Sequence, residues 1–332
     1  MSALILSEHD VIRHLPMSEC IEAMAAVLAA RARGEAQMPL RSVLRGEGMS
    51  GMLGLMPASR GGGAPAYSVK AVCVFPGNPR LGLDAHQGVV ALFDGETGRP
   101  TAVLNGSAVT SIRTAAVSAL ATRLLAPGRG GTLAIVGAGV QAAAHVRALL
   151  AVRDFEEVRI CARTAEHARA LAERAALEHA ASGARFEAFA GAREALDGAQ
   201  VVLTATNSST PVLERGWLAP GAHVNAIGAS IPSARELDVA TLAQAELFVD
   251  ARESLAAEAG EYRLALAEGA IAGIEHVRAE LGEVAAGLHP GRSGAQALTV
   301  FRSLGIGVED LAAAELALAG ARRAGAGVEV EL

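Results

Sequence analysis

Along the chain, the spacing of apolar and polar residues changes near residue 107. Before this point, short apolar runs alternate with turn-forming stretches such as Gly77-Asn78-Pro79, a pattern typical of β-strands joined by tight turns. We therefore expect an antiparallel N-terminal region. Its predicted strands cover residues 40–44, 52–56, 67–75, 88–93 and 101–104.

Helical patterns accompany this region. Ser7 and Asp10 have the spacing of a helix cap,. A longer helix is expected over 18–33, where apolar residues recur at helical spacing up to Gly34,. Two further helices are expected, over 107–125 and, close to the C-terminus, over 308–323.

From residue 132 onward, short continuous apolar runs alternate with alanine-rich stretches. Strands are expected at 133–136, 158–161, 201–204, 223–227 and 247–249, with helices beginning near Gln141, Ala165 and Ala192. Strands without polar alternation are typical of a parallel sheet covered by helices on both faces. The predicted fold class is α/β, with a Rossmann-type parallel sheet domain beside a second, α+β domain.

Composition narrows the function classes. A chain of 332 residues with 51% hydrophobic and 3% aromatic residues can bury a large core of Ala, Val and Leu,. The net charge of −6 and the lack of a basic block argue against nucleic-acid binding,. Three scattered cysteines fit neither a disulfide framework nor a metal cluster,. We see no signal peptide or membrane segment and expect a cytoplasmic protein.

The strongest local motif is Gly137-Ala138-Gly139-Val140-Gln141-Ala142. It follows a predicted buried strand and opens a helix, which is the context that a dinucleotide-binding fingerprint requires. Gly137 allows the tight turn, Gly139 lets a pyrophosphate approach the backbone, and Ala142 lets helix and strand pack closely. Backbone N–H groups from Val140 and Gln141 onward would face the phosphates.

The end of the next strand predicts the form of the cofactor. NAD enzymes of this fold usually carry an acidic residue there, which accepts hydrogen bonds from the ribose. This chain instead has Arg163 and Thr164, which can bind a 2′-phosphate. We therefore expect NADP, with NAD as the alternative; in the competing interpretation Arg163 is an ordinary surface arginine.

Three cationic residues, Arg41, Lys70 and Arg113, lie in apolar segments of the first region. A cation in such a setting is costly unless a partner balances its charge, and an anionic ligand is one such partner. Alternatives remain for each residue. Arg113 could pair with Asp84 or Glu96, Lys70 could reach the surface, and the adjacent Arg45 could replace Arg41.

Several motifs taken together resemble the ornithine cyclodeaminase/mu-crystallin family. They occur in the family's order and extend over nearly the whole chain. In this sequence they are residues 54–58, 69–70, 111–116, 136–141, 225–229 and 301–305, followed by Glu309-Asp310.

The resemblance implies a domain built from both chain ends. Residues 1–115, completed by 306–332, would bind substrate and form a homodimer, and 116–305 would form the Rossmann NAD(P)-binding domain. Arg41 and Arg113 would hold the substrate carboxylate, and Lys70 would contact the substrate and exchange a proton with its nitrogen.

The resemblance also implies cofactor contacts outside the glycine motif. Thr114 would lie near a phosphate, Thr204 and Thr206 would follow a Rossmann strand, and Ser303 would lie near the nicotinamide amide. Each of these residues is also common at helix caps and turns.

Two positions depart from the family's cyclodeaminases. Those enzymes carry an Asp and a Glu where this chain has Ser230 and Gly54, and neither replacement supplies a carboxylate,. The resemblance therefore implies an NAD(P)H-dependent reductase of small cyclic imino acids, such as Δ1-pyrroline-2-carboxylate or Δ1-piperideine-2-carboxylate. Ornithine cyclodeaminase, an alanine-type dehydrogenase and a non-catalytic NADP-binding protein are the alternatives.

Overall fold

The computed structural model describes residues 2–228 and 230–331. The chain divides into two compact units. Unit 1 comprises Met1–Arg113 and Gly305–Leu332, and unit 2 comprises Thr114–Leu304. The family resemblance had implied a division after residues 115 and 305. Ala229, which belongs to one of the family motifs, lies outside the described residues.

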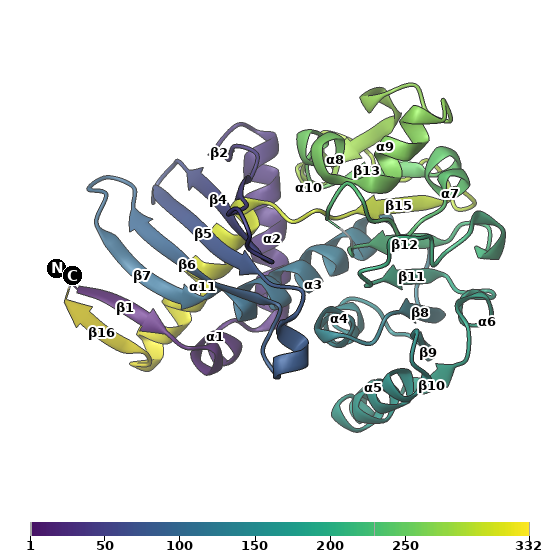
Figure 1. Ribbon diagram of the computed structural model, residues 1–332, viewed down its shortest axis with the longest axis horizontal. Coiled ribbons are helices and arrows are strands. Elements are labelled where there is room, and N and C mark those ends of the chain that lie inside the picture. Colours follow the sequence, from purple (N-terminus) through teal and green to yellow (C-terminus); the bar gives the residue numbers. More distant parts are fainter. Residues whose placement is uncertain (1, 229, 332) are drawn as a thin grey trace. The chain divides into compact units, whose positions relative to one another are not determined.

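Unit 1 contains a mixed sheet in the order β16-β1-β7-β6-β5-β4-β2, with β3 paired to β4 (Figure 1). Its pairs are antiparallel except β1 with β7. The strands are β1 (Ser2–Leu6), β2 (Ala36–Gln37), β3 (Ser42–Leu44), β4 (Met52–Arg60), β5 (Ala66–Val74), β6 (His86–Asp94), β7 (Pro100–Asn105) and β16 (Val328–Glu331).

Two stacked helices of unit 1 pack over the middle strands of this sheet. Helix α11 (Gly307–Ala324) packs on β4, β5 and β6, and α2 (Met17–Ala32) packs on α11. Helix α1 (Glu8–His14) begins with the expected capping box between Ser7 and Asp10. A 3-10 turn, η1 (Asn78–Leu81), precedes β6. The unit boundary falls within helix α3 (Gly106–Leu125).

Unit 2 contains an all-parallel sheet in the order β10-β9-β8-β11-β12-β15-β13-β14. This arrangement confirms the predicted Rossmann-type fold class. The strands are β8 (Thr132–Val136), β9 (Glu157–Cys161), β10 (Arg185–Phe189), β11 (Val201–Thr204), β12 (His223–Ala226), β13 (Glu246–Val249), β14 (Val277–Glu280) and β15 (Thr299–Arg302).

Two apolar clusters hold the helices of unit 2 against its sheet, one containing Val202 and Val224 and the other Ile135 and Leu203. Alternate residues of β11 thus belong to different clusters, because side chains of a strand point to opposite faces. The helices are α4 (Val140–Leu150), α5 (Ala165–Glu178), α6 (Ala192–Leu196), α7 (Val239–Gln244), α8 (Arg252–Glu258), α9 (Gly260–Ala267) and α10 (Leu281–Ala285), with 3-10 turns η2 (Ala180–Ser182), η3 (Arg215–Trp217) and η4 (Ile274–His276).

Six strands of the described structure were not predicted from the apolar pattern: β1, β2, β10, β14, β15 and β16. Strands β10 and β16 lie at sheet edges and have few buried side chains, so their sequences carry no continuous apolar signal. Strand β15 is fully buried but contains Arg302, a charged residue that interrupts the pattern expected of a central strand.

Within the described residues, no helix combines the length and the apolar character needed to span a lipid bilayer.

Candidate active site

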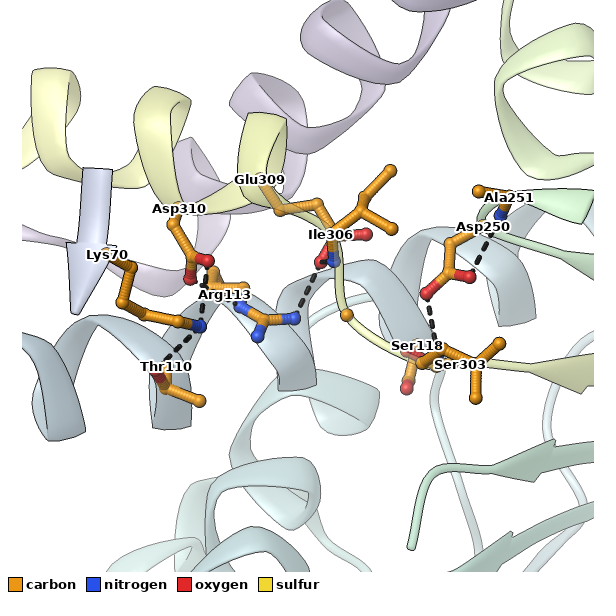
Figure 2. Close-up of polar contacts among 12 residues, drawn as sticks. Lys70, Thr110, Arg113, Ser118, Asp250, Ala251, Ser303, Ile306, Glu309 and Asp310 are labelled. Atoms are coloured by element: carbon orange, nitrogen blue, oxygen red, sulfur yellow. Dashed lines mark hydrogen bonds and ion pairs between the residues drawn. The ribbon is translucent and has the colours of Figure 1, made fainter. Parts of the chain in front are cut away.

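Lys70 lies on β5 with its side chain buried and only 3% of the residue exposed. Its Nζ atom is 2.7 Å from Oδ2 of Asp310 and 3.4 Å from the Thr110 hydroxyl (Figure 2). Asp310 stands in the first turn of α11, the helix that packs on this part of the sheet. Lys70 is therefore an internal, charge-paired residue and not a surface lysine.

Arg113, on α3, is also buried and pairs with both acids at the start of α11. Its Nη1 donates to Glu309 at 2.6 Å and its Nε donates to Asp310 at 3.0 Å. These partners replace Asp84 and Glu96, which the sequence had offered as candidates. Asp310 thus connects Arg113 to Lys70, as Figure 2 shows.

Gly305 lies against the Arg113 guanidinium and links Arg41 to the same cluster. A Cβ at Gly305 would lie 2.6 Å from Arg113 Nη1, and the backbone there has a φ of +73°. Both features favour glycine. The Gly305 carbonyl accepts a hydrogen bond of 2.8 Å from Nη2 of Arg41. Arg41 is half-buried whereas Arg45 is exposed, so Arg41 is the arginine that reaches the cluster.

The environment of Lys70 brings its pKa down to about 8. Burial is the main cause, because it penalises the ammonium form. Asp310 opposes this effect, and the neighbouring charges of Arg113 and Arg41 add to it. Burial also acts on Asp310, but Arg113 and Lys70 outweigh it and hold the pKa of this carboxyl below its usual range. A lysine with a pKa near 8 can exchange protons close to neutral pH.

The expected dinucleotide turn has its predicted local structure in unit 2. Gly137 follows β8 with a φ of +127°, and a Cβ there would overlap the carbonyl oxygen of Ala205. Gly139 caps the start of α4, and a Cβ there would have open space around it. Val140, the first helical residue, is 66% exposed. Gln141 follows it, half-buried, in the first turn of the helix.

These features fit a dinucleotide. The turn leaves space above Gly139, and the first N–H groups of α4 receive no bond from a capping side chain. A helix start of this kind binds phosphate groups through its backbone N–H groups and its dipole. Residues 137–141 would therefore hold the pyrophosphate of a nicotinamide dinucleotide.

Arg163 and Thr164 follow β9, which pairs with β8 in the parallel sheet. Arg163 is exposed, and Thr164 is half-buried at the N-cap of α5. The structure thus places both residues at the carboxyl edge of the strand next to the glycine turn, which is where this fold binds the adenosine ribose.

A buried carboxylate, Glu236, joins the carboxyl ends of β11 and β12. It accepts hydrogen bonds from the Thr204 hydroxyl at 2.7 Å, from the Thr206 N–H at 2.6 Å and from the Gly228 N–H at 2.9 Å. A Cβ at Gly228 would overlap the Thr206 carbonyl. Thr204, to which the resemblance assigned a cofactor contact, has no exposed surface, and its hydroxyl donates to this internal acid.

Ser303 and Thr114 differ in how far they are buried. Ser303 is buried directly after β15, and its hydroxyl has no hydrogen-bond partner within the described chain. Asp250 accepts bonds from the Ala251 and Leu304 N–H groups and thereby fixes the backbone beside Ser303 (Figure 2). Thr114 is half-buried on α3.

Sequence reasoning missed the acids. Glu309 and Asp310 were noted only as part of a family motif, and Glu236 was not noted. The sequence did carry a signal for Glu309 and Asp310, since two adjacent acids open an otherwise apolar helix there. Lys70 also carried an unused signal, because it is the only lysine among 29 basic Lys and Arg residues.

Comparison with known proteins places these observations in context. The sequence profile of the ornithine cyclodeaminase/mu-crystallin family matches residues 1–322. Ketimine reductase mu-crystallin from Mus musculus is 38% identical over 315 residues, which are 94% of this chain and 95% of that protein. Delta(1)-pyrroline-2-carboxylate reductase from Bacillus cereus is 34% identical over 329 residues, or 99% of each chain.

Solved structures of similar enzymes superpose on this chain over nearly its whole length. Delta(1)-pyrroline-2-carboxylate reductase of Thermococcus litoralis, in complex with NADH and L-proline, superposes with a TM-score of 0.93 at 33% identity. It covers 98% of this chain, and this chain covers all of it. An archaeal alanine dehydrogenase dimer with bound NAD superposes with a TM-score of 0.92, again at 33% identity and with both chains fully covered.

Proposed function

The chain belongs to the ornithine cyclodeaminase/mu-crystallin family, and from this we propose that it is an NAD(P)H-dependent reductase of small cyclic imino acids. Its substrates would be ketimine carboxylates such as Δ1-pyrroline-2-carboxylate and Δ1-piperideine-2-carboxylate, and its products the corresponding L-amino acids. The observation that carries this proposal is the buried cluster of Lys70, Arg113, Glu309 and Asp310, which combines anion-binding cations with a lysine of lowered pKa.

The charges of this cluster favour a monocarboxylate. Arg41, Lys70 and Arg113 bring three positive charges, and Glu309 and Asp310 bring two negative ones. One substrate carboxylate would balance the remaining positive charge, and an uncompensated buried charge is costly. Arg41 and Arg113 would hold this carboxylate, since arginine can offer two parallel N–H groups to it.

Reduction of the C=N bond requires a hydride at carbon and a proton at nitrogen. A reduced nicotinamide supplies the hydride when it is bound. Lys70 would contact the substrate and donate the proton from Nζ to the substrate nitrogen, because its lowered pKa makes the ammonium a competent acid near neutral pH,. The two arginines would restrict the orientation of the substrate and so lower the entropic part of the barrier.

NADP is the proposed cofactor, with NAD as the alternative. Arg163 is exposed, and Thr164 caps the next helix at the edge where a 2′-phosphate would lie. Gly137, Gly139, Val140 and Gln141 would hold the pyrophosphate. Arg163→Asp should weaken NADPH binding by about 1–3 kcal/mol, the scale of a charged hydrogen bond, and leave NADH binding less affected. Equal loss for both cofactors in a fluorescence titration would remove Arg163 from phosphate recognition.

Thr114 and Ser303 are proposed as further cofactor contacts. The Ser303 hydroxyl, which is buried and has no hydrogen-bond partner among the described residues, is suited to the nicotinamide amide, and Thr114 to a phosphate,. Thr204 contributes indirectly in this proposal, since its bond to Glu236 helps to position Thr206 and Gly228.

A single assay separates the candidate reactions. Purified protein should oxidise NADPH in proportion to added Δ1-pyrroline-2-carboxylate and release L-proline. Conversion of ornithine to proline and ammonia without consumption of NADPH would instead indicate the cyclodeaminase. Alanine dehydrogenase is kept as the second candidate because the archaeal dehydrogenase has a TM-score of 0.92 with this chain. It predicts NADPH oxidation with pyruvate and ammonia.

We propose that the protein is a homodimer joined through the sheet of unit 1. Leu44, Leu55, Tyr67 and Val89 are exposed on the face of β3–β6 opposite to Lys70. An apolar sheet face of this kind is typical of a subunit interface, and the archaeal relative is described as a dimer. Sedimentation equilibrium should give twice the mass of the chain. The proposed location is the cytoplasm, where nicotinamide cofactors and amino acids are available.

A further inference from the structure

Asp310 has an unusual position for an acid, since one carboxylate contacts two buried cations from different elements. Its Oδ2 atom lies 2.7 Å from Lys70 Nζ on β5, and its Oδ1 atom accepts a 3.0 Å bond from Arg113 Nε on α3 (Figure 2). The Asp310 side chain is buried in the first turn of α11. The carboxylate is therefore fixed on both sides.

We infer that Asp310 is the positioning residue of the reaction: it aims the Lys70 ammonium and keeps it protonated for transfer to the substrate nitrogen. This inference rests on the proposed function, in which Lys70 supplies the proton. An ammonium group has three N–H donors. Asp310 and the Thr110 hydroxyl orient two of them, and the third is available for a substrate atom.

The groups around Lys70 give Asp310 its specific effect. Arg113 from α3 and Arg41 from the segment before β3 both lower the pKa of Lys70, and so does burial. His86 on β6 also interacts with Lys70, and burial keeps the pKa of this imidazole below its usual range, so it is mainly neutral at pH 7. Among these described neighbours, the carboxylate of Asp310 is the group that raises the pKa of Lys70.

Glu309, the adjacent acid, shares the partner Arg113 with Asp310. Its carboxylate bonds Arg113 Nη1 at 2.6 Å and caps the Ile306 N–H at 3.4 Å. Glu309 thus supports the substrate-binding arginine, and Asp310 supports both this arginine and the proton donor. Neutralising Asp310 leaves burial, Arg41 and Arg113 to act on Lys70 without opposition, so Lys70 should lose its proton at lower pH.

The single lysine of the chain makes a direct test possible. Protein labelled with [13C]lysine contains one labelled ε-carbon, whose chemical shift reports the protonation of Lys70. The wild-type protein should titrate near the pKa of about 8. In Asp310→Asn the midpoint should fall by about one pH unit or more, the usual effect of losing an adjacent opposite charge. Asp310→Glu keeps the charge and should stay near the wild type.

Glu315→Gln is the matched control. Glu315 lies on the same helix and pairs with Arg60 at 2.8 Å, so its neutralisation removes a helix carboxylate without touching the cluster. Its Lys70 midpoint and its activity should remain those of the wild type. If Asp310→Asn does not fold, Asp310→Ser removes the same charge with a smaller side chain whose hydroxyl can still accept a hydrogen bond.

Kinetics give the second measurement. For Δ1-pyrroline-2-carboxylate reduction, the alkaline limb of kcat/KM should move to lower pH in Asp310→Asn by the same amount as the NMR midpoint. A purely structural Asp310 would lower the rate equally at every pH. A folded Asp310→Asn protein with an unchanged Lys70 midpoint would overturn the inference. If no imine is reduced by the wild type, the proposed function fails, whereas the NMR titration still decides whether Asp310 controls Lys70.

Discussion

The two candidate sites of this molecule are built in opposite ways. The substrate site of unit 1 consists of charged side chains from β5, α3 and α11, with Lys70 and Asp310 separated by 240 positions in the chain. The dinucleotide turn of unit 2 consists of the backbone of five consecutive residues, 137–141, between one strand and one helix.

This difference determines how each site responds to change. A buried cluster of paired charges depends on every member, because removal of one partner leaves an unbalanced charge in a medium that solvates it poorly. A backbone turn depends on shape, so only side chains that fill the turn or strain it should matter. Substitutions in the charge cluster should therefore have larger effects than most substitutions in the turn.

Lys70→Ala should have the largest effect. The proton donor is lost, and general acid catalysis contributes about 10²–10⁴-fold in rate. We expect kcat/KM for imine reduction to fall by this factor, with the affinity for NADPH unchanged because the dinucleotide turn belongs to unit 2. Steady-state kinetics together with a fluorescence titration would measure both quantities. Undiminished turnover would remove Lys70 from the mechanism.

Glu309→Gln should have its main effect on stability. The substitution leaves the buried Arg113 guanidinium without its 2.6 Å partner, and breaking such a pair typically costs about 3–5 kcal/mol. Urea unfolding should show this loss, whereas Glu315→Gln, which removes a half-buried pair between the same helix and β4, should cost much less. Equal losses of unfolding free energy in the two variants would show that the charge cluster is no more sensitive to substitution than the rest of the helix.

Arg41→Ala and Arg45→Ala form a matched pair for the substrate carboxylate. Arg41 contacts the Gly305 carbonyl beside Arg113, and Arg45 is exposed. Loss of a charged hydrogen bond of about 1.5–3 kcal/mol should raise the KM for the imine about 10–100-fold in Arg41→Ala only. A comparable increase in Arg45→Ala would transfer the role to that residue.

Gly137→Ala and Gly139→Ala test the backbone site in the same manner. Gly137 has a φ of +127° and abuts Ala205, so alanine should strain the fold by about 1–3 kcal/mol and lower Tm. At Gly139 a Cβ has open space. Gly139→Ala should therefore keep the wild-type Tm and weaken NADPH binding about tenfold, or about 1.4 kcal/mol, by blocking the pyrophosphate. Unchanged binding in Gly139→Ala would count against the turn as the phosphate site.

The contrast also explains what the sequence could predict. The glycine turn and its flanking strand and helix are local features, because their residues are neighbours in the chain. The parallel sheet could be predicted from the alternation of apolar strands with helices. Arg41, Lys70 and Arg113 could be recognised as cations in apolar segments. Their partners could not be identified in this way, because Glu309 and Asp310 meet Arg113 only after α11 packs on the sheet.

Glu236 illustrates the same limit within unit 2. It lies in a loop between β12 and α7, and its role appears only when β11 and β12 bring Thr204, Thr206 and Gly228 to one carboxylate. Thr204 was accordingly assigned to the cofactor from the sequence, although its hydroxyl faces this internal acid. A polar residue at a strand end can serve a ligand or the strand itself, and only the tertiary structure separates the two.

The charge cluster around Lys70 is proposed to bind the carboxylate of a small imino or amino acid. The most direct test follows the labelled ε-carbon of this single lysine in the presence of NADP⁺ while L-proline is added, with L-prolinamide as the ligand that lacks the carboxylate. Proline should shift the resonance and raise the pKa of Lys70, because an added anion stabilises the ammonium, and prolinamide should do neither. An equal response to proline and prolinamide, or no response to either at saturating concentrations, would contradict carboxylate binding by this cluster.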